Sequence, residues 1–219
     1  MTFQPVESQR KMDKLIIFGF GGHARSVGNV ALSQGFRHLI FVENTARSGE
    51  NFLGHRVVPS LEEVDASWVF AHAASGDGLK RKAQCEQIVD SGLILLAVVS
   101  PSSSIGVGSV IGEGSFVGDM CHIGPMAQIG TGCILNTGCV VEHECIVGDF
   151  THVSVNSTVA GRSRVGRLSM LGAGSVVIDG VSISDRITVG AGSVVTRDIV
   201  EPGTYVGAPV KKIRSHSKG

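Results

Sequence analysis

Residues 136–153 hold the densest group of side chains that could take part in a reaction. Glu142 and Glu144 flank His143, and His152 follows a few residues later. A histidine has a pKa near neutrality and can accept a proton at cellular pH. A neighbouring carboxylate stabilises the imidazolium and makes the ring more basic. The pattern predicts a general base at His143, with the alternative that an exposed histidine is inert.

A second candidate site is the glycine-rich turn at residues 19–24, which reads Gly-Phe-Gly-Gly-His-Ala between a predicted strand and a predicted helix. The backbone N–H groups of such a turn and the helix N-terminus favour a diphosphate. The same pattern suggests a dinucleotide, and Glu43 lies where a dinucleotide fold places its ribose-binding acid. The alternative is that the glycines only close a tight turn.

The N-terminal part of the chain reads as alternating strands and helices. We predict strands at 14–18, 39–42, 68–74 and 93–99, and helices at 23–34 and 79–91. This alternation predicts a parallel α/β sheet of Rossmann-like type. About 85 residues make only half of a full dinucleotide-binding domain, which argues against a whole dinucleotide.

From residue 105 the sequence repeats every six residues. An aliphatic residue stands at each of sixteen positions in steps of six, from Ile105 to Val195, and glycine follows it at nine of them. A small residue lies four positions after most of these aliphatics. Because six is a multiple of two, strand alternation keeps both on one inward face, whereas helical spacing drifts. Glycine after the aliphatic is expected to permit the turns.

This repeat resembles the hexapeptide-repeat family, whose fold is the left-handed parallel β-helix. In that family three hexapeptides form one triangular coil, so residues 105–195 would give about five coils. The resemblance predicts an N-terminal tail (1–12), an α/β nucleotide-sugar-binding domain (13–99) and a β-helix acyltransferase domain with a C-terminal tail (100–219). A narrow interior would explain why only 5% of residues are aromatic.

The β-helix, the motif around Glu142–Glu144 and the short α/β domain together resemble nucleotide-aminosugar N-acetyltransferases, such as the UDP-N-acetylbacillosamine type. Sialic-acid O-acetyltransferases and GDP-perosamine N-acetyltransferases are similar in design. The resemblance implies that His143 is the general base and that Glu144 tunes it. It also implies two sets of binding residues. The sugar-nucleotide set is Gly21, Gly22, His23, Glu43, Asn44 and Asn136, and the acetyl-CoA set is His152, Ala173, Ala191 and Lys211.

The resemblance implies acetyl transfer from acetyl-CoA to the 4-amino group of a nucleotide-linked 4-amino-4,6-dideoxysugar. A UDP-sugar is favoured. A dTDP- or GDP-sugar stays an alternative, because the segment 71–78 departs from the turn that relatives place at the nucleotide. His72 in this segment is expected to be structural. The rival activity is O-acetylation of a sialic acid or related sugar. A C3 homotrimer with acetyl-CoA between neighbouring chains is expected.

Other classes of function fit the sequence less well. A zinc enzyme on the same scaffold needs three converging histidines, and His122, His143 and His152 lack that family's spacing, so no metal is expected. A non-catalytic scaffold stays open. The balance of 19 basic and 19 acidic residues argues against nucleic-acid binding. Residues 1–12 lack a signal peptide's apolar core, and the longest apolar run, 93–99, is too short to span a membrane, so a cytoplasmic protein is expected.

Overall fold

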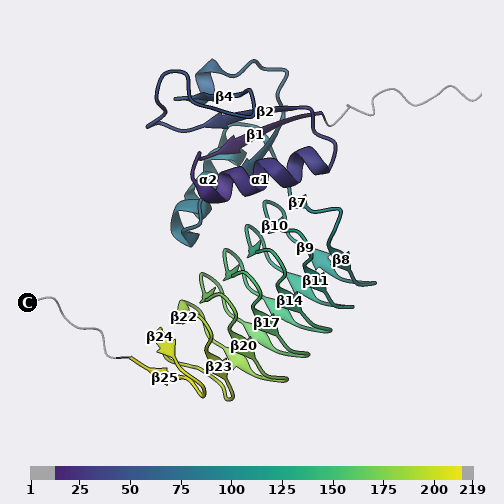
Figure 1. Ribbon diagram of the computed structural model, residues 1–219, viewed down its shortest axis with the longest axis vertical. Coiled ribbons are helices and arrows are strands. Elements are labelled where there is room, and N and C mark those ends of the chain that lie inside the picture. Colours follow the sequence, from purple (N-terminus) through teal and green to yellow (C-terminus); the bar gives the residue numbers. More distant parts are fainter. Residues whose placement is uncertain (1–12, 214–219) are drawn as a thin grey trace, which may run out of the picture.

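The computed structural model describes residues 13–213, and it divides them between an α/β sheet and a β-helix (Figure 1). The α/β part lies against one side of the β-helix, and β24 and β25 lie at the C-terminal end of the β-helix. The predicted tail at 1–12 and the last residues of the predicted second domain, 214–219, lie outside the described residues.

The α/β part has a six-stranded sheet with strand order β3-β4-β2-β1-β5-β6. All neighbours are parallel except the β3–β4 hairpin. The elements are β1 (Lys14–Phe18), α1 (Gly22–Ser33), β2 (His38–Val42), β3 (Asn51–Phe52), β4 (His55–Val58), a 3-10 turn (Leu61–Glu63), β5 (Phe70–Ala73), α2 (Gly78–Asp90) and β6 (Ile94–Leu95). The central strand β1 is apolar and buried on both faces, as expected for a covered parallel sheet. The predicted parallel sheet and both helices are confirmed.

The predicted strand at 93–99 is wrong as a single element. β6 pairs with β5 in the α/β sheet, whereas β7 (Val98–Val99) pairs with β10 in the β-helix. The apolar run therefore contains the passage from one sheet to the other, with Leu96 and Ala97 between the two strands. Hydrophobicity alone shows no break there, because Leu95 and Val98, on either side of the passage, are both apolar and buried.

The β-helix has three sheets, which we call faces 1, 2 and 3, of eight, six and five strands. Face 1 contains β7, β10 (Phe116–Val117), β13 (Ile134–Leu135), β16 (His152–Val153), β19 (Met170–Leu171), β22 (Ile187–Val189), β24 (Gly203–Val206) and β25 (Lys211–Lys212). Face 2 contains β8 (Ser104–Ile105), β11 (His122–Ile123), β14 (Val140–Val141), β17 (Thr158–Val159), β20 (Val176–Val177) and β23 (Val194–Val195). Face 3 contains β9 (Val110–Ile111), β12 (Gln128–Ile129), β15 (Ile146–Val147), β18 (Arg164–Val165) and β21 (Ser182–Ile183).

The coils stack in register every 18 residues, as in the pairing of Ile123 with Val141 and of Val141 with Val159. From residue 117 onward the repeated aliphatics are buried, and they form one core with the small residues that precede them. Three corners join the faces, and we name each by the faces it connects: corner 1/2, corner 2/3 and corner 3/1. The predicted left-handed β-helix and its inward pattern are confirmed.

The role predicted for the repeated glycines needs correction. The glycine after each aliphatic is not in the left-handed region. Instead, a Cβ there would strike the next coil, as at Gly112, where it would lie 2.5 Å from the carbonyl oxygen of Gly130. The left-handed turn comes two residues later, at fifteen positions from 108 to 192 in steps of six. Eight of these are not glycine: Met120, Met126, Glu144, Phe150, Asn156, Arg162, Leu168 and Arg186. The first glycine series therefore allows close stacking, and the second allows the turn.

The five cysteines are free and buried, and four of them occupy the small inward position of the repeat. The sulfur atoms of Cys121 and Cys139, which are 18 residues apart, lie 3.6 Å from each other on adjacent coils. Burial raises the pKa of Cys133 to about 12 and that of Cys85 to about 11. These thiols are therefore protonated at neutral pH and are poor nucleophiles.

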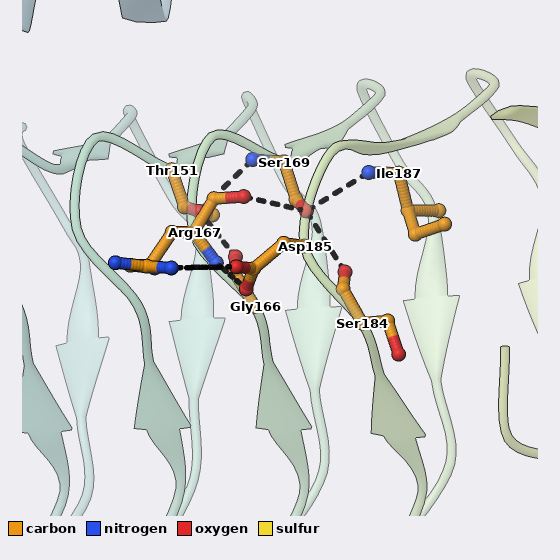
Figure 2. A network of polar contacts seen from close by, with 7 residues as sticks. All are labelled: Thr151, Gly166, Arg167, Ser169, Ser184, Asp185 and Ile187. Carbon is orange, nitrogen blue, oxygen red and sulfur yellow. Dashed lines mark hydrogen bonds and ion pairs between the residues drawn. The ribbon is translucent and has the colours of Figure 1, made fainter. Parts of the chain in front are cut away.

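Hydroxyl groups link the coils inside corner 3/1. The Thr151 hydroxyl donates to the carbonyl oxygen of Gly166 at 2.6 Å and accepts from the N–H of Ser169 at 3.1 Å. One coil further, the Ser169 hydroxyl donates to the carbonyl oxygen of Ser184 at 3.2 Å and accepts from the N–H of Ile187 at 3.1 Å (Figure 2). Each hydroxyl thus satisfies buried backbone groups of the coil that follows.

Replacing Ser169 by alanine is expected to lower the free energy of unfolding by about 1–3 kcal/mol, because the buried N–H of Ile187 loses its acceptor. The matched control is Ser182→Ala, whose hydroxyl lies on the outer side of face 3, and its effect is expected to be within about 0.5 kcal/mol. Urea unfolding followed by circular dichroism measures both. Equal values for the two variants would contradict the proposed role of the hydroxyl ladder.

Candidate functional site

A cavity of about 720 Å³ opens in the α/β part, at the carboxyl ends of β1, β2 and β5. All five residues that the sequence assigns there to the sugar nucleotide line it: Gly21, Gly22, His23, Glu43 and Asn44. A Cβ on Gly21 or Gly22 would meet nothing within 4 Å, so the space above the turn is open. The first turn of α1 faces this space with its N-terminal N–H groups, an arrangement that suits an anion.

The cavity has further lining residues, of which sequence reasoning considered only those within the segment 71–78. Ser75 and Gly76 come from the turn after β5, and Lys80, Ala83 and Gln84 come from α2. The exposed Lys80 adds a positive charge, and the Gln84 side chain accepts from the N–H of Ser75 at 3.0 Å. A smaller cavity of about 290 Å³ adjoins this one and shares Glu43, Asn44 and Gln84 with it. The signal for Lys80 was available, since it lies one turn into the helix that follows a strand end.

Glu43 is held in a fixed position at the end of β2. Its carboxylate accepts from the N–H of Thr45 at 3.3 Å and from the Thr45 hydroxyl at 3.0 Å. The remaining carboxylate oxygen is left for a ligand hydroxyl or N–H group. The geometry therefore suits recognition of a neutral donor, such as a ribose hydroxyl or a base edge.

His143 lies at corner 2/3 of the β-helix and is partly open to solvent, with 41% of its side chain exposed. Its Nδ1 lies 3.1 Å from a carboxylate oxygen of Glu144. This contact places the proton on Nδ1, which leaves the lone pair on Nε2. Glu144 occupies a left-handed turn position, with φ of 58°, that recurs in every coil, so its backbone is the normal one for this corner.

The ring of His143 lies over the next coil, where Gly161 occupies the equivalent position. A Cβ on Gly161 would lie 2.5 Å from Nε2 of His143 and 3.1 Å from a carboxylate oxygen of Asp179, one coil further. The absence of a side chain at 161 therefore gives the imidazole its place. Asp179 itself pairs with Arg162 at the same corner.

The other predicted residues of the β-helix occupy corner 1/2 and the far end. Asn136, Ala173 and Ala191 lie in turns of corner 1/2, and both alanines are exposed. The side-chain oxygen of Asn136 accepts from the N–H of Thr137 at 2.9 Å. Lys211 is exposed on β25, at the end of the β-helix. Corners 1/2 and 2/3 are the two edges of face 2, so His143 and Asn136 flank one face.

His152 does not lie with the other residues predicted for acetyl-CoA. It points outward from face 1, as expected, but the α/β part covers that face and buries Nε2. Nε2 of His23 and Nε2 of His72 are buried there too and lack a hydrogen-bond partner within the described residues. Burial, with a contribution from the charge of Arg81, lowers the pKa of His152 to about 4, of His72 to about 4 and of His23 to about 3.

The two halves of the predicted site lie on different sides of one chain. The α/β part packs on face 1, where Phe116 and Ile134 join its core. His143 lies at corner 2/3, which is the corner of a triangular prism opposite face 1. The cavity and His143 are therefore separated by the width of the β-helix within a single chain.

Neither a metal cluster nor a membrane helix is found among residues 13–213. No three His, Cys, Asp or Glu side chains in this part are grouped so that they could hold a metal ion. His122, His143 and His152 in particular lie on face 2, at corner 2/3 and on face 1. Across the same described range, no helix is both long and apolar enough to cross a membrane.

Known structures resemble this chain along most of its length, although no protein-family model matches it. The acetyltransferase domain of PglB from Neisseria gonorrhoeae FA1090 is 27% identical with a TM-score of 0.86, and the match covers 92% of this chain and 100% of that one. It has also been solved in complex with acetyl coenzyme A. GDP-perosamine N-acetyltransferase from Caulobacter crescentus, as a histidine-to-alanine variant with CoA and GDP-perosamine, is 31% identical with a TM-score of 0.84, covering 92% of this chain and 97% of that one.

The chain belongs to the nucleotide-aminosugar N-acetyltransferases with a hexapeptide-repeat β-helix. This likeness covers 92% of the chain and therefore extends over both the α/β part and the β-helix. This protein is therefore an acyltransferase, and acetyl-CoA is its expected co-substrate.

The buried histidines predict how stability depends on pH. Their folded-state pKa values, about 3 to 4, lie below the value of 6.5 that applies when they are exposed. Below pH 6.5 the unfolded chain therefore binds protons that the folded chain does not bind. The free energy of unfolding should fall between pH 7.5 and 5.5, by up to about 1.4 kcal/mol per pH unit for each histidine.

Urea unfolding at pH 7.5, 6.5 and 5.5 measures this dependence. The His72→Gln variant should show a smaller fall than the wild type, because one titrating group is removed. A matched control is His38→Gln, which changes an exposed histidine of β2. A fall that is the same in all three proteins would contradict the assignment to the buried cluster.

Proposed function

We propose that this protein transfers the acetyl group of acetyl-CoA to the 4-amino group of a nucleotide-linked 4-amino-4,6-dideoxysugar, with His143 as general base. The observation that carries the proposal is the His143–Glu144 contact, which leaves an exposed imidazole lone pair at the edge of the β-helix. Family membership supports the same reaction type. O-acetylation of a sialic acid or related sugar uses the same base, and the assay below separates it.

The proposed reaction is a direct attack without an acyl-enzyme. The amine nitrogen forms a bond to the thioester carbonyl carbon while Nε2 of His143 takes its proton. Glu144 stabilises the imidazolium through Nδ1. Backbone N–H groups stabilise the oxyanion, the C–S bond breaks, and the CoA thiolate receives the proton. Holding both substrates together supplies much of the acceleration.

We place the sugar nucleotide in the cavity of the α/β domain, whose last strand is β6, and acetyl-CoA along the β-helix domain, whose first strand is β7. Gly21, Gly22 and His23 would face the diphosphate, and Glu43 and Asn44 the nucleoside. Asn136 would lie beside the sugar, and Ala173, Ala191 and Lys211 along acetyl-CoA. His152 lies beside Gly76 with its Nε2 buried, and its contact with acetyl-CoA stays a prediction.

We propose a UDP-sugar as the acceptor, and dTDP- and GDP-sugars are the alternatives. The Caulobacter crescentus protein was solved with GDP-perosamine, which supports a GDP-sugar as the alternative acceptor. Supplying the protein with 4-aminosugars of the three nucleotides and with a sialic acid, and following free thiol, decides between them. Turnover only with the hydroxyl acceptor would overturn the proposed N-acetylation.

A homotrimer is proposed because one chain cannot bring its cavity to its own His143. The outward residues of face 2 include Val140, Val176 and Val194, which are half-exposed and suit burial against another chain. Packing face 2 around a threefold axis would expose corners 1/2 and 2/3 to neighbouring chains. The cavity of one chain could then supply the acceptor to His143 of another.

Replacing His143 by alanine is expected to lower kcat by about 10²–10⁴-fold, because no other group takes the amine proton. The matched control is His38→Ala, an exposed histidine of the α/β domain, which should keep wild-type turnover. Thiol release under saturating acetyl-CoA measures both. Near-normal turnover by the His143→Ala variant would remove the proposed base.

A site shared between chains predicts complementation. The His143→Ala variant lacks the base, and Gly22→Asp places a negative charge in the open space of the cavity. Each should be inactive alone, whereas co-expression should restore turnover, because mixed assemblies contain an intact cavity facing an intact His143. Sedimentation should give three times the mass of one chain. Trimers without restored turnover would place both halves of the site in one chain.

A further inference from the structure

We infer that Arg81 is a positioning residue for the acceptor half of the reaction: it fixes the Ser75–Gly76 turn of the cavity to the β-helix. The inference rests on the proposed function, because it assigns the cavity to the sugar nucleotide. Arg81 lies on the first turns of α2, and the cavity is lined by the turn that precedes this helix. The side chain itself points away from solvent and is fully buried.

The guanidinium of Arg81 connects two parts of the molecule through four carbonyl oxygens. Nη1 donates to Ser75 at 2.8 Å and to Gly76 at 3.2 Å, both in the turn after β5. Nε donates to Gly132 at 2.6 Å, and Nη2 donates to Phe150 at 2.7 Å. The last two residues lie in corner 3/1 on successive coils. One side chain therefore holds the wall of the cavity and the scaffold in a fixed relation.

The cost of burying the Arg81 guanidinium indicates that this side chain serves to fix the position of the backbone rather than to add stability. Burying a guanidinium is costly, and an apolar side chain of similar size would fill the same space at lower cost. Here the charge is bonded to backbone carbonyls rather than to a carboxylate. Only the planar fork of arginine presents donors in enough directions to reach four oxygens from one position.

The contacts with the turn also decide where its N–H groups point. A trans peptide unit directs its C=O and its N–H to opposite sides. Since the carbonyl groups of Ser75 and Gly76 point to Arg81, the N–H groups of Gly76 and Asp77 point away from it. The N–H of Ser75 is separately held by Gln84 at 3.0 Å. The turn therefore has a single imposed shape, with its bonding groups assigned residue by residue.

The start of α2 rests on the same corner. A Cβ on Gly78 would lie 3.0 Å from the carbonyl oxygen of Phe150, which is also the oxygen that Arg81 binds. A lysine at 81 can donate to at most part of this set, because its ammonium is a single point. Loss of the guanidinium should weaken the contacts that hold the Ser75–Gly76 turn. It should leave corner 2/3, where His143 lies, unchanged.

Binding of UDP, dTDP and GDP by calorimetry, together with steady-state kinetics, tests the inference. In Arg81→Lys, the Kd of the nucleotide that the wild type binds, and the KM of its sugar, should rise by about tenfold or more. The KM of acetyl-CoA should stay within about twofold of the wild-type value, since the change lies outside its proposed site. The matched control is Lys82→Met, which alters the neighbouring exposed residue that forms an ion pair with Glu86. It should bind like the wild type.

The outcomes separate the inference from the proposed function. A wild type that binds none of the three nucleotides overturns the proposed function, and the inference with it. Wild-type affinity in a folded Arg81→Lys variant overturns the inference alone, as does an equal rise in both KM values. If Arg81→Lys does not fold, Gly78→Ala, which presses on the Phe150 carbonyl, should raise Kd by about two- to fivefold. Unchanged binding by that variant would also overturn the inference.

Discussion

The structure depends on the in-register stacking of coils at a spacing of 18 residues. Main-chain hydrogen bonds along each face require adjacent backbones to lie close, so a Cβ at positions such as Gly112 or Gly166 would overlap the next coil. The narrow interior admits one aliphatic and one small residue per side. The same constraint decides which corner side chains lie close together, since every residue at a corner is aligned with those one coil before and after it. The alignment of His143, Gly161 and Asp179 is one result.

The α/β domain separates the two candidate functional regions of the chain, which are its own cavity and the corner of the β-helix that presents His143. It covers face 1 through an apolar contact with Phe116 and Ile134, and it adds the polar anchor of Arg81 at corner 3/1. The described residues of the α/β domain leave corners 1/2 and 2/3 uncovered. The cavity that suits a sugar nucleotide and the corner that presents His143 are then distributed over opposite sides of the same protein, a division that supports the proposed site between chains.

Much of this fold could be predicted because the repeat is a property of the sequence itself. A step of six shows which residues point inward, and a glycine-rich turn between a strand and a helix marks the cavity. The sequence could not show which glycine series makes the turns, since close approach of coils depends on the neighbouring backbone. It could not show that 93–99 crosses between two sheets, or that the α/β domain covers His152. Arg81 was missed because its role arises only when α2 meets the rest of the molecule.

The same division explains why the nature of the acceptor is harder to infer than the base. The imidazole of His143 needs only a carboxylate on Nδ1 and a glycine beneath it, and the stacking every 18 residues aligns Gly161 with it. Recognition of a sugar nucleotide depends on the cavity, whose wall is the irregular Ser75–Gly76 turn. This turn obeys no repeat, and its shape is imposed by contacts from Arg81 and Gln84. Differences in acceptor among proteins with this β-helix are therefore expected to arise from such turns rather than from the edge that bears the base.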